Sequence, residues 1–229
     1  MKSNVPSEVS KVRRDLTGYC FHFLRREPDP VAAMRSILGE GCLRGRTYRP
    51  ASVPTICFTD APLIEVTRQD DVLETLEYER LSLWGIGFRK IDLFQRGARP
   101  VIYQDPSELK LLDPSIWWRH VDFDPAKIDF TWQREWRLQA DRLTFTSQEV
   151  VLVIPDVPRL VRDLWYVSID VDVSDGEAVL YSQTLKKWDF VPLAHADITN
   201  DKSIEVCRTE EWRDIISEDY YDQMEYAGP

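Results

Sequence analysis

Short clusters of apolar residues, bounded by Gly, Pro and Asp, predict a series of β-strands along the chain. Some clusters alternate with polar residues at period two, which is the spacing of a strand with one buried face. The predicted strands are residues 19–24, 55–59, 85–90, 100–103, 130–139, 150–154, 165–171 and 178–182. Because only a few helical patterns lie among them, the order of elements indicates an α+β fold.

The clearest helical pattern starts at Pro30, since proline is favoured in the first turn of a helix. Gly39 and Gly41 are typical of a helix end. We therefore predict a helix over residues 31–38. The other predicted helices are residues 62–83 with an amphipathic leucine stripe, residues 4–16, and an acidic segment over about residues 205–226.

Length and composition are those of a folded protein with a sizeable core. The chain has 229 residues, of which 43% are hydrophobic and 11% aromatic, so it needs no disulfide or metal to stabilise a core. With no internal repeat or linker, we expect one domain over residues 1–229 with its core in residues 18–182. The apolar runs are too short for a membrane helix and no signal-peptide pattern is present, so we expect a cytoplasmic protein.

The net charge is −10, which disfavours sequence-independent binding of nucleic acid. Arginines nevertheless gather in the first fifty residues, while the last twenty are dominated by Glu and Asp, so a basic face can coexist with an acidic tail. The four cysteines match no zinc spacing, and we expect them to be buried small apolar residues. We also expect no metal cofactor.

Two residues stand out as candidates for chemistry. His22 lies inside an apolar strand, where it is either a core histidine or a ligand-binding one. Glu135 lies between Arg134 and Arg137, and we expect these guanidinium groups to hold the pKa of its carboxyl down. Period two places Glu135 on the face opposite Trp136, and a salt-bridged strand face is the structural alternative.

The segment WGIGFRK, residues 84–90, contains two glycines that permit two interpretations. Gly85 and Gly87 could form a phosphate-binding loop, but a GxG pair without a third glycine and a following helix is a weak signal. The alternative, which we favour, is that a helix ends here and a strand begins.

Several motifs resemble the ADP-ribosyltransferase superfamily over about residues 18–140. They are FHF at 21–23, SILGEGCL at 36–43, ICFTDAPL at 56–63 and WQREWRL at 132–138. The nearest similarities are to the DarT-like toxins and to the AbiGi abortive-infection family of phage-defence proteins, which CFTDAPL, WGIGFRK and GARPVIY resemble most. The resemblance implies mixed or antiparallel β-sheets flanked by short helices.

The resemblance also implies an activity, which is transfer of ADP-ribose from NAD to nucleic acid or protein in a phage-defence or toxin–antitoxin system. It implies that Glu135 is catalytic, with Gln133 two residues upstream, and that His22 binds the adenosine-side ribose. Arg46 or Arg49 would bind the pyrophosphate, and Thr59 would be the small polar residue after its strand. The ring stacked on nicotinamide would be that of Tyr48, Phe58 or Tyr103.

Two departures leave other functions open. Phe23 and Leu24 follow His22, so the hydroxyl of an HxT pattern is missing, and the Gln133–Glu135 pair fits an acceptor other than arginine. A catalytically inactive relative that binds a toxin or antitoxin partner, or acts as a sensor, is the main alternative. A phosphate-ester or nucleotide hydrolase using Asp60, Glu135 and a metal lacks a ligand cluster with metal spacing.

Overall fold

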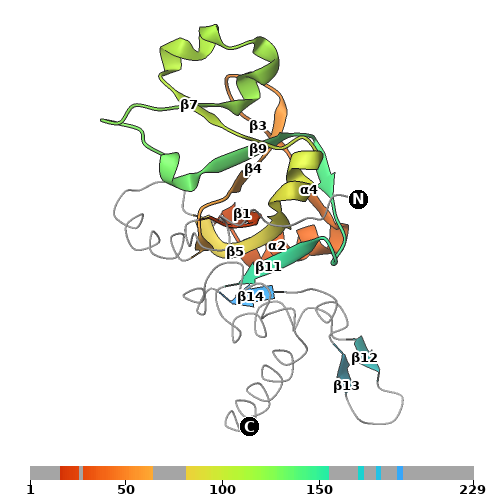
Figure 1. Cartoon of the computed structure of the whole chain (residues 1–229). Helices are drawn as coiled ribbons and strands as arrows, with labels where there is room; N and C mark the ends of the chain where they lie inside the picture. Colours follow the sequence, from red (N-terminus) through yellow and green to blue (C-terminus); the bar gives the residue numbers. More distant parts are fainter. Residues whose placement is uncertain are drawn as a thin grey trace, which may run out of the picture.

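A mixed sheet forms the centre of the molecule (Figure 1). The computed structural model describes residues 16–25, 28–63, 81–154, 170–172, 179–181 and 190–192. The strand order is β14 (Phe190–Pro192), β11 (Val150–Ile154), β5 (Leu81–Arg89), β1 (Tyr19–Arg25), β4 (Pro54–Thr59), β9 (Glu135–Gln139) and β6 (Arg99–Pro100), with β3 (Arg46–Thr47) also paired to β4. Only β11 and β14 are parallel; the other pairs in this sheet are antiparallel.

Short helices and two-stranded ribbons complete the described part of the chain. The helices are α2 (Pro30–Glu40) and α4 (Lys90–Gln95), with 3₁₀ turns η1 (Pro106–Leu111), η2 (Pro114–Arg119) and η3 (Thr131–Gln133). The ribbons pair β2 (Cys42–Arg44) with β10 (Arg142–Thr144), β7 (Ile102–Gln104) with β8 (His120–Asp122), and β12 (Asp170–Asp172) with β13 (Val179–Tyr181). The predicted α+β class is confirmed. None of the described helices has the length and apolar character needed to cross a membrane.

Local sequence explains helix α2. The Asp29 carboxylate caps its first turn by accepting from the backbone N–H groups of Val31 and Ala32, at 2.9 and 3.0 Å. Gly41 ends the helix in the left-handed conformation, with φ 58°. The prediction for this helix is confirmed, and Gly39 lies inside it. The predicted terminal helices, at residues 4–16 and about 205–226, fall almost wholly outside the described residues.

The prediction of a helix through residue 83 is wrong at its end, and residues 64–80 lie outside the described part. Residues 81–83 begin β5, which pairs with β1 along most of its length. Gly85 and Gly87 are interior strand residues, so they form neither a helix end nor a phosphate loop. A Cβ at Gly87 would come within 2.9 Å of the Phe21 ring and 2.8 Å of Val151, so the strand needs glycine here.

The segment predicted as one strand over residues 130–139 is divided in two. Residues 131–133 form η3, Arg134 is left-handed with φ 45°, and β9 starts only at Glu135. Within β9 the predicted faces are correct, because Trp136 and Leu138 pack against the core cluster while Glu135 pairs with Arg137. The strand predicted at 100–103 is also interrupted, at Val101, whose N–H donates to the Glu135 carbonyl.

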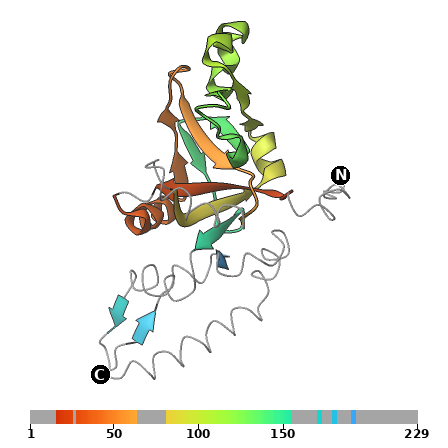
Figure 2. The ribbon, with the colours of Figure 1, turned by 90° about the vertical axis from the view of Figure 1, so that its left-hand side faces the viewer.

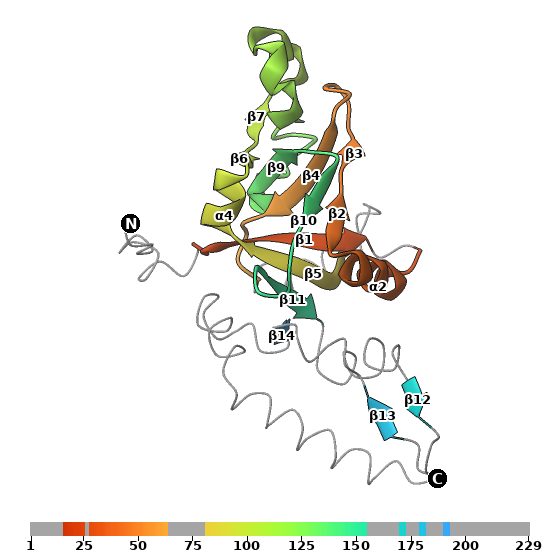
Figure 3. The same cartoon turned by 90° about the vertical axis from the view of Figure 1, so that its right-hand side faces the viewer.

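The sheet opens between β1 and β4. These strands are paired at one position, Phe21 with Thr59, whereas β1 and β5 are paired at six. Figures 2 and 3 show from two sides that β1 and β5 run across the direction of β4 and β9. The core cluster includes Met34 and Leu38 of α2 together with residues of β1, β4, β5 and β9. The pairing of β1 with β4 thus ends next to the segment that contains His22.

Two glycine substitutions test this arrangement. A Cβ at Gly45, between β2 and β3, would lie 2.1 Å from the backbone oxygen of Ala140, so Gly45→Ala must displace β3. We expect a loss of about 1–3 kcal/mol in the free energy of unfolding, as for other overpacked sites. The matched control is Gly39→Ala, because nothing lies within 4 Å of its Cβ and alanine favours a helix.

Gly39→Ala should leave stability unchanged or raise it by up to about 1 kcal/mol. Chemical denaturation of both variants measures the difference. Equal stability of the two variants would contradict the close approach of Gly45 to the chain at Ala140.

Candidate functional site

His22 lies in β1 at the point where the sheet opens. Its Nδ1 is 2.8 Å from the carbonyl oxygen of Cys57 in β4. Since a carbonyl only accepts, Nδ1 carries the proton and Nε2 is left as an acceptor in the neutral ring. The side chain is half-buried, with its ring edge toward Phe58 at 5.9 Å between centroids. His22 thus replaces a missing backbone hydrogen bond between β1 and β4.

The surroundings of His22 favour its neutral form. Burial lowers the pKa of His22, the bond to the Cys57 carbonyl raises it, and the charge of Arg46 lowers it further. The net pKa is below the ordinary 6.5. At neutral pH the residue therefore presents an uncharged imidazole that can accept a hydrogen bond.

Cys57 connects His22 to the polar face of β9. Its backbone is paired with that of Arg137, and its thiol lies close enough to Tyr48 and Glu135 for each of them to influence its pKa. Burial, with a contribution from the Glu135 charge, raises the pKa of the Cys57 thiol to about 12. The thiol therefore stays protonated at neutral pH.

Glu135 and Arg137 form a forked ion pair on the same face of β9. Arg137 donates from Nε to one carboxylate oxygen at 2.7 Å and from Nη2 to the other at 3.5 Å. Their side chains are only 11% and 12% exposed. Burial lowers the pKa of Arg137, but the neighbouring Glu135 carboxylate more than offsets this and raises it. The guanidinium group therefore stays charged.

Two hydroxyl groups hold the loop before Glu135. The Tyr103 hydroxyl donates to the Phe130 carbonyl at 3.1 Å and accepts from the Glu135 N–H at 3.0 Å. The Thr59 hydroxyl donates to the Gln133 carbonyl and accepts from the Ala61 N–H. These bonds enclose Arg134 and its left-handed backbone, which a non-glycine residue adopts only when its surroundings enforce it. The start of β9 is therefore tightly fixed.

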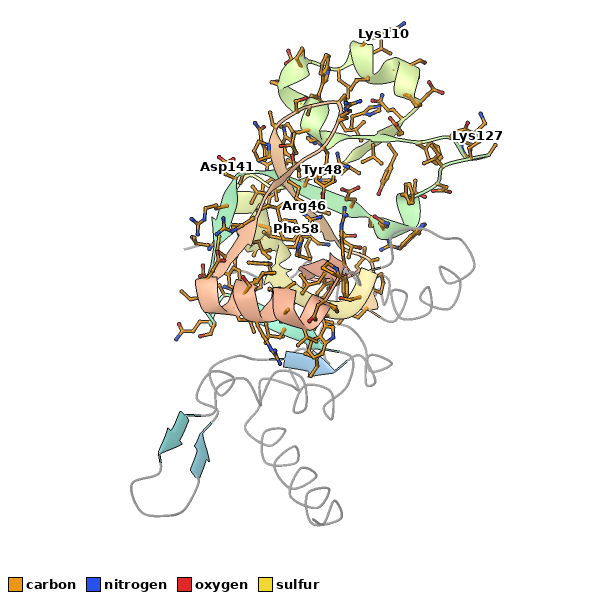
Figure 4. All side chains as sticks on the ribbon, turned by 180° about the vertical axis from the view of Figure 1, so that it is seen from behind. Arg46, Tyr48, Phe58, Lys110, Lys127 and Asp141 are labelled. Atoms are coloured by element: carbon orange, nitrogen blue, oxygen red, sulfur yellow. The ribbon has the colours of Figure 1, made fainter. Side chains whose placement is uncertain are left out.

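The two candidate pyrophosphate ligands lie on and beside β3. Arg46 and Arg49 are both exposed, and Arg46 is close enough to influence the pKa values of His22 and Tyr48. Within the described residues, the side chain of Arg46 makes no hydrogen bond or ion pair, while its backbone pairs with Thr55. Figure 4 shows Arg46, Tyr48 and Phe58 in one region of the molecule. A positive charge that no described side chain neutralises is thus close enough to act on the neutral imidazole.

The aromatic candidates differ in accessibility. Phe58 is 3% exposed and packs edge-on against Phe88 and His22, so its ring is closed to a nicotinamide. Tyr103 uses its hydroxyl to fix the loop before Glu135. Tyr48 is half-buried and lies near the Arg137 guanidinium, 5.8 Å from its ring centroid. Tyr48 is therefore the best placed of the three for stacking.

From the strand patterns and the order of the motifs we predict that His22 and Glu135 lie on adjacent strands with their side chains on the same face, and this prediction is wrong. Strand β4 lies between β1 and β9. Phe21 pairs with Thr59, and Thr59 pairs with Glu135, so Glu135 lies in the row of Phe21 and not in that of His22. Cys57 lies between them: its carbonyl is bonded to His22, and its backbone pairs with Arg137, the ion-pair partner of Glu135.

Asp60, the acid proposed for a metal-dependent hydrolase, is engaged elsewhere. Its carboxylate accepts from Lys90 at 2.9 Å and from the Trp136 indole at 3.1 Å. Trp136 and Glu135 point to opposite faces of β9. No group of three or more His, Cys, Asp or Glu side chains suited to a metal ion occurs in the described segments.

Sequence reasoning missed two features near the site. Cys57 alternates with the buried Ile56 and Phe58, so period two could have placed its thiol on the polar face. The tandem motif Asp-Pro-Ser at 105–107 and 113–115 was overlooked as a short repeat. In both copies the aspartate accepts from the serine N–H at 2.8 Å and caps a 3₁₀ turn.

No family model, curated protein or solved structure matches the chain. The resemblance to ADP-ribosyltransferases therefore stays a prediction, and function has to be inferred from the residues and their geometry.

The lowered pKa of His22 makes a prediction about stability and pH. Because the unfolded chain binds a proton at His22 more readily than the folded chain, the stability that depends on neutral His22 is complete above about pH 6.5 and falls below it. His22→Asn should therefore lose less stability than the wild type between about pH 7 and pH 5. Urea denaturation across this range measures both slopes. Identical slopes would show that His22 titrates normally.

Proposed function

We propose that the protein is an NAD-dependent ADP-ribosyltransferase of a phage-defence or toxin–antitoxin system, with nucleic acid or protein as the acceptor. The observation that carries this proposal is the linkage at Cys57. The carbonyl oxygen of Cys57 lies 2.8 Å from Nδ1 of the His22 ring, its backbone pairs with that of Arg137, and its thiol lies near Glu135 and Tyr48, which both influence its pKa. Such buried polar networks are characteristic of functional sites.

The reaction requires a carboxylate at a fixed position. The bond between ribose C1′ and the nicotinamide nitrogen breaks, and the electron pair leaves with nicotinamide. The ribose becomes oxocarbenium-like, and an acceptor oxygen or nitrogen bonds to C1′ while its proton passes to a base or to solvent. Glu135 stabilises the developing positive charge electrostatically. Its forked pair with Arg137 and the Tyr103 bond to its backbone favour a single orientation.

Binding of NAD uses groups around β3 and β1. Because the register puts His22 and Glu135 in different rows of the sheet, NAD reaches both past the end of the β1–β4 pairing. The Nε2 of His22 accepts from a hydroxyl of the adenosine-side ribose, and Tyr48 stacks on the nicotinamide. Arg46 binds the pyrophosphate, for which a guanidinium fork is suited, with Arg49 as a second candidate. Thr59 holds the Gln133 backbone, and Gln133 contributes to the choice of acceptor.

The proposal includes an ADP-ribosyltransferase-like fold. The residues that resemble the superfamily occur along the chain in the order β1, α2, β4 and β9. This agreement of order supports an ADP-ribosyltransferase-like fold.

A second candidate function has its own observation. Arg137 contacts both oxygens of the Glu135 carboxylate, and a purely structural ion pair does the same. A catalytically inactive relative would use this pair for stability and act as an antitoxin or sensor by binding a partner protein.

Substitution of Glu135 separates the two candidates. With labelled NAD, the wild type should modify nucleic acid or total cell protein, and Glu135→Gln should lower the rate by about 100- to 1000-fold because it removes the stabilising charge. Glu40→Gln is the matched control, since Glu40 also pairs with an arginine, Arg44 at 2.8 Å, but on the exposed surface at the end of α2. The control should keep the wild-type rate within about twofold.

Thermal melting of all three proteins distinguishes loss of chemistry from loss of fold. Transfer by the wild type at background level would favour the inactive relative. Full activity of Glu135→Gln would remove Glu135 from the mechanism.

A further inference from the structure

A small lobe, residues 105–119, projects beyond the sheet next to β7 and β8 (Figure 1). It consists of the two 3₁₀ turns η1 and η2, and we call it the DPS lobe after its repeated motif. Each turn has the same cap, formed by Asp105 in η1 and Asp113 in η2. The two turns therefore have the same capped local structure but contact different parts of the molecule.

Only the second turn is attached to Arg137. The Nη1 of this residue donates to the carbonyl oxygens of Trp118 and His120, each at 3.0 Å. The first carbonyl belongs to η2 and the second follows it directly. Through Nε and Nη2 the same guanidinium group holds the Glu135 carboxylate. None of the hydrogen bonds found in the described residues joins η1 to Arg137.

The guanidinium group couples the lobe to the carboxylate mechanically. The group is planar and its N–H donors have fixed directions. A movement of the Trp118 and His120 carbonyls therefore turns the whole guanidinium group, including the N–H groups that bind Glu135. Arg137 is 12% exposed, and the Tyr48 ring lies 5.8 Å from its centre. Water therefore has little access to replace either set of bonds, and the position of η2 is transmitted to Glu135.

We propose that Arg137 is a positioning residue through which the second turn of the DPS lobe sets the orientation of the Glu135 carboxylate. This inference rests on the proposed transferase function. It makes η2 a control point, because a molecule that displaces this turn changes the rate of transfer without touching NAD.

Two kinds of variant test the coupling by the kcat and KM for NAD. Arg137→Gln should lower kcat by about 100-fold with KM nearly unchanged, because misplacing a catalytic group by about 1 Å has such an effect. Arg137→Lys keeps the charge but not the fork, and should stay at least about tenfold below the wild type. Full activity of the lysine variant would overturn the proposal.

The repeat supplies a matched pair that leaves Arg137 in place. Asp113→Ala removes the cap of η2, and Asp105→Ala removes the same cap from η1. Asp113→Ala should lower kcat several-fold, whereas Asp105→Ala should retain the wild-type value. Equal effects of the two, or an effect confined to KM, would overturn the proposal even if Arg137→Gln does not fold.

A readout independent of activity separates this inference from the proposed function. In ¹⁵N-arginine-labelled protein, Asp113→Ala should shift the Nε–H resonance of Arg137 and Asp105→Ala should not. A wild type without transferase activity but with this selective shift refutes the proposed function and leaves the coupling of η2 to Arg137 intact. An active wild type without the selective shift refutes the coupling alone.

Discussion

The hydrogen bond between His22 and the Cys57 carbonyl is the contact on which the rest of the site depends. Strands β1 and β4 stop pairing after Phe21 and Thr59, so the carbonyl of Cys57 would otherwise lack a partner at the opening of the sheet. An unpaired buried carbonyl costs about 1–3 kcal/mol. The imidazole satisfies it through Nδ1, and its Nε2 is an acceptor in the neutral ring. His22 thus contributes both to the contact between two strands of the sheet and to the candidate site.

On the other side of β4, a charged pair is kept in surroundings that disfavour charge. Glu135 and Arg137 are nearly buried, and removing two ions from water is offset only when their geometry and further hydrogen bonds are good. Here Arg137 satisfies two backbone carbonyls and Tyr103 satisfies the Glu135 N–H. An apolar pair in the same place would provide stability more simply, so we interpret the retained charges as functional.

The sequence correctly predicts the helices and strands whose signals lie within the element itself. The predictions fail where pairing with a distant segment determines the secondary structure. Helix α2 follows from the proline, aspartate and glycine at its ends, and the run of Val150–Ile154 gives β11 directly. Residues 81–83 were assigned to a helix because their leucines fit a stripe, yet pairing with β1 makes them strand. For the site, His22 and Glu135 could be singled out from their neighbours in the sequence. Their relative placement could not, because insertion of β4 between their strands is a property of the topology.

The central claim is that NAD binds at the opening of the sheet beside His22, and histidine NMR tests it most directly. The chain has three histidines, His22, His120 and His195, so the ring-nitrogen resonances can be assigned by single substitutions. Titration with NAD should shift the His22 signals saturably, with Nε2 changing more than Nδ1, while His120, which is 2% exposed, stays unchanged. Absence of any change at His22 with saturating NAD would contradict the account.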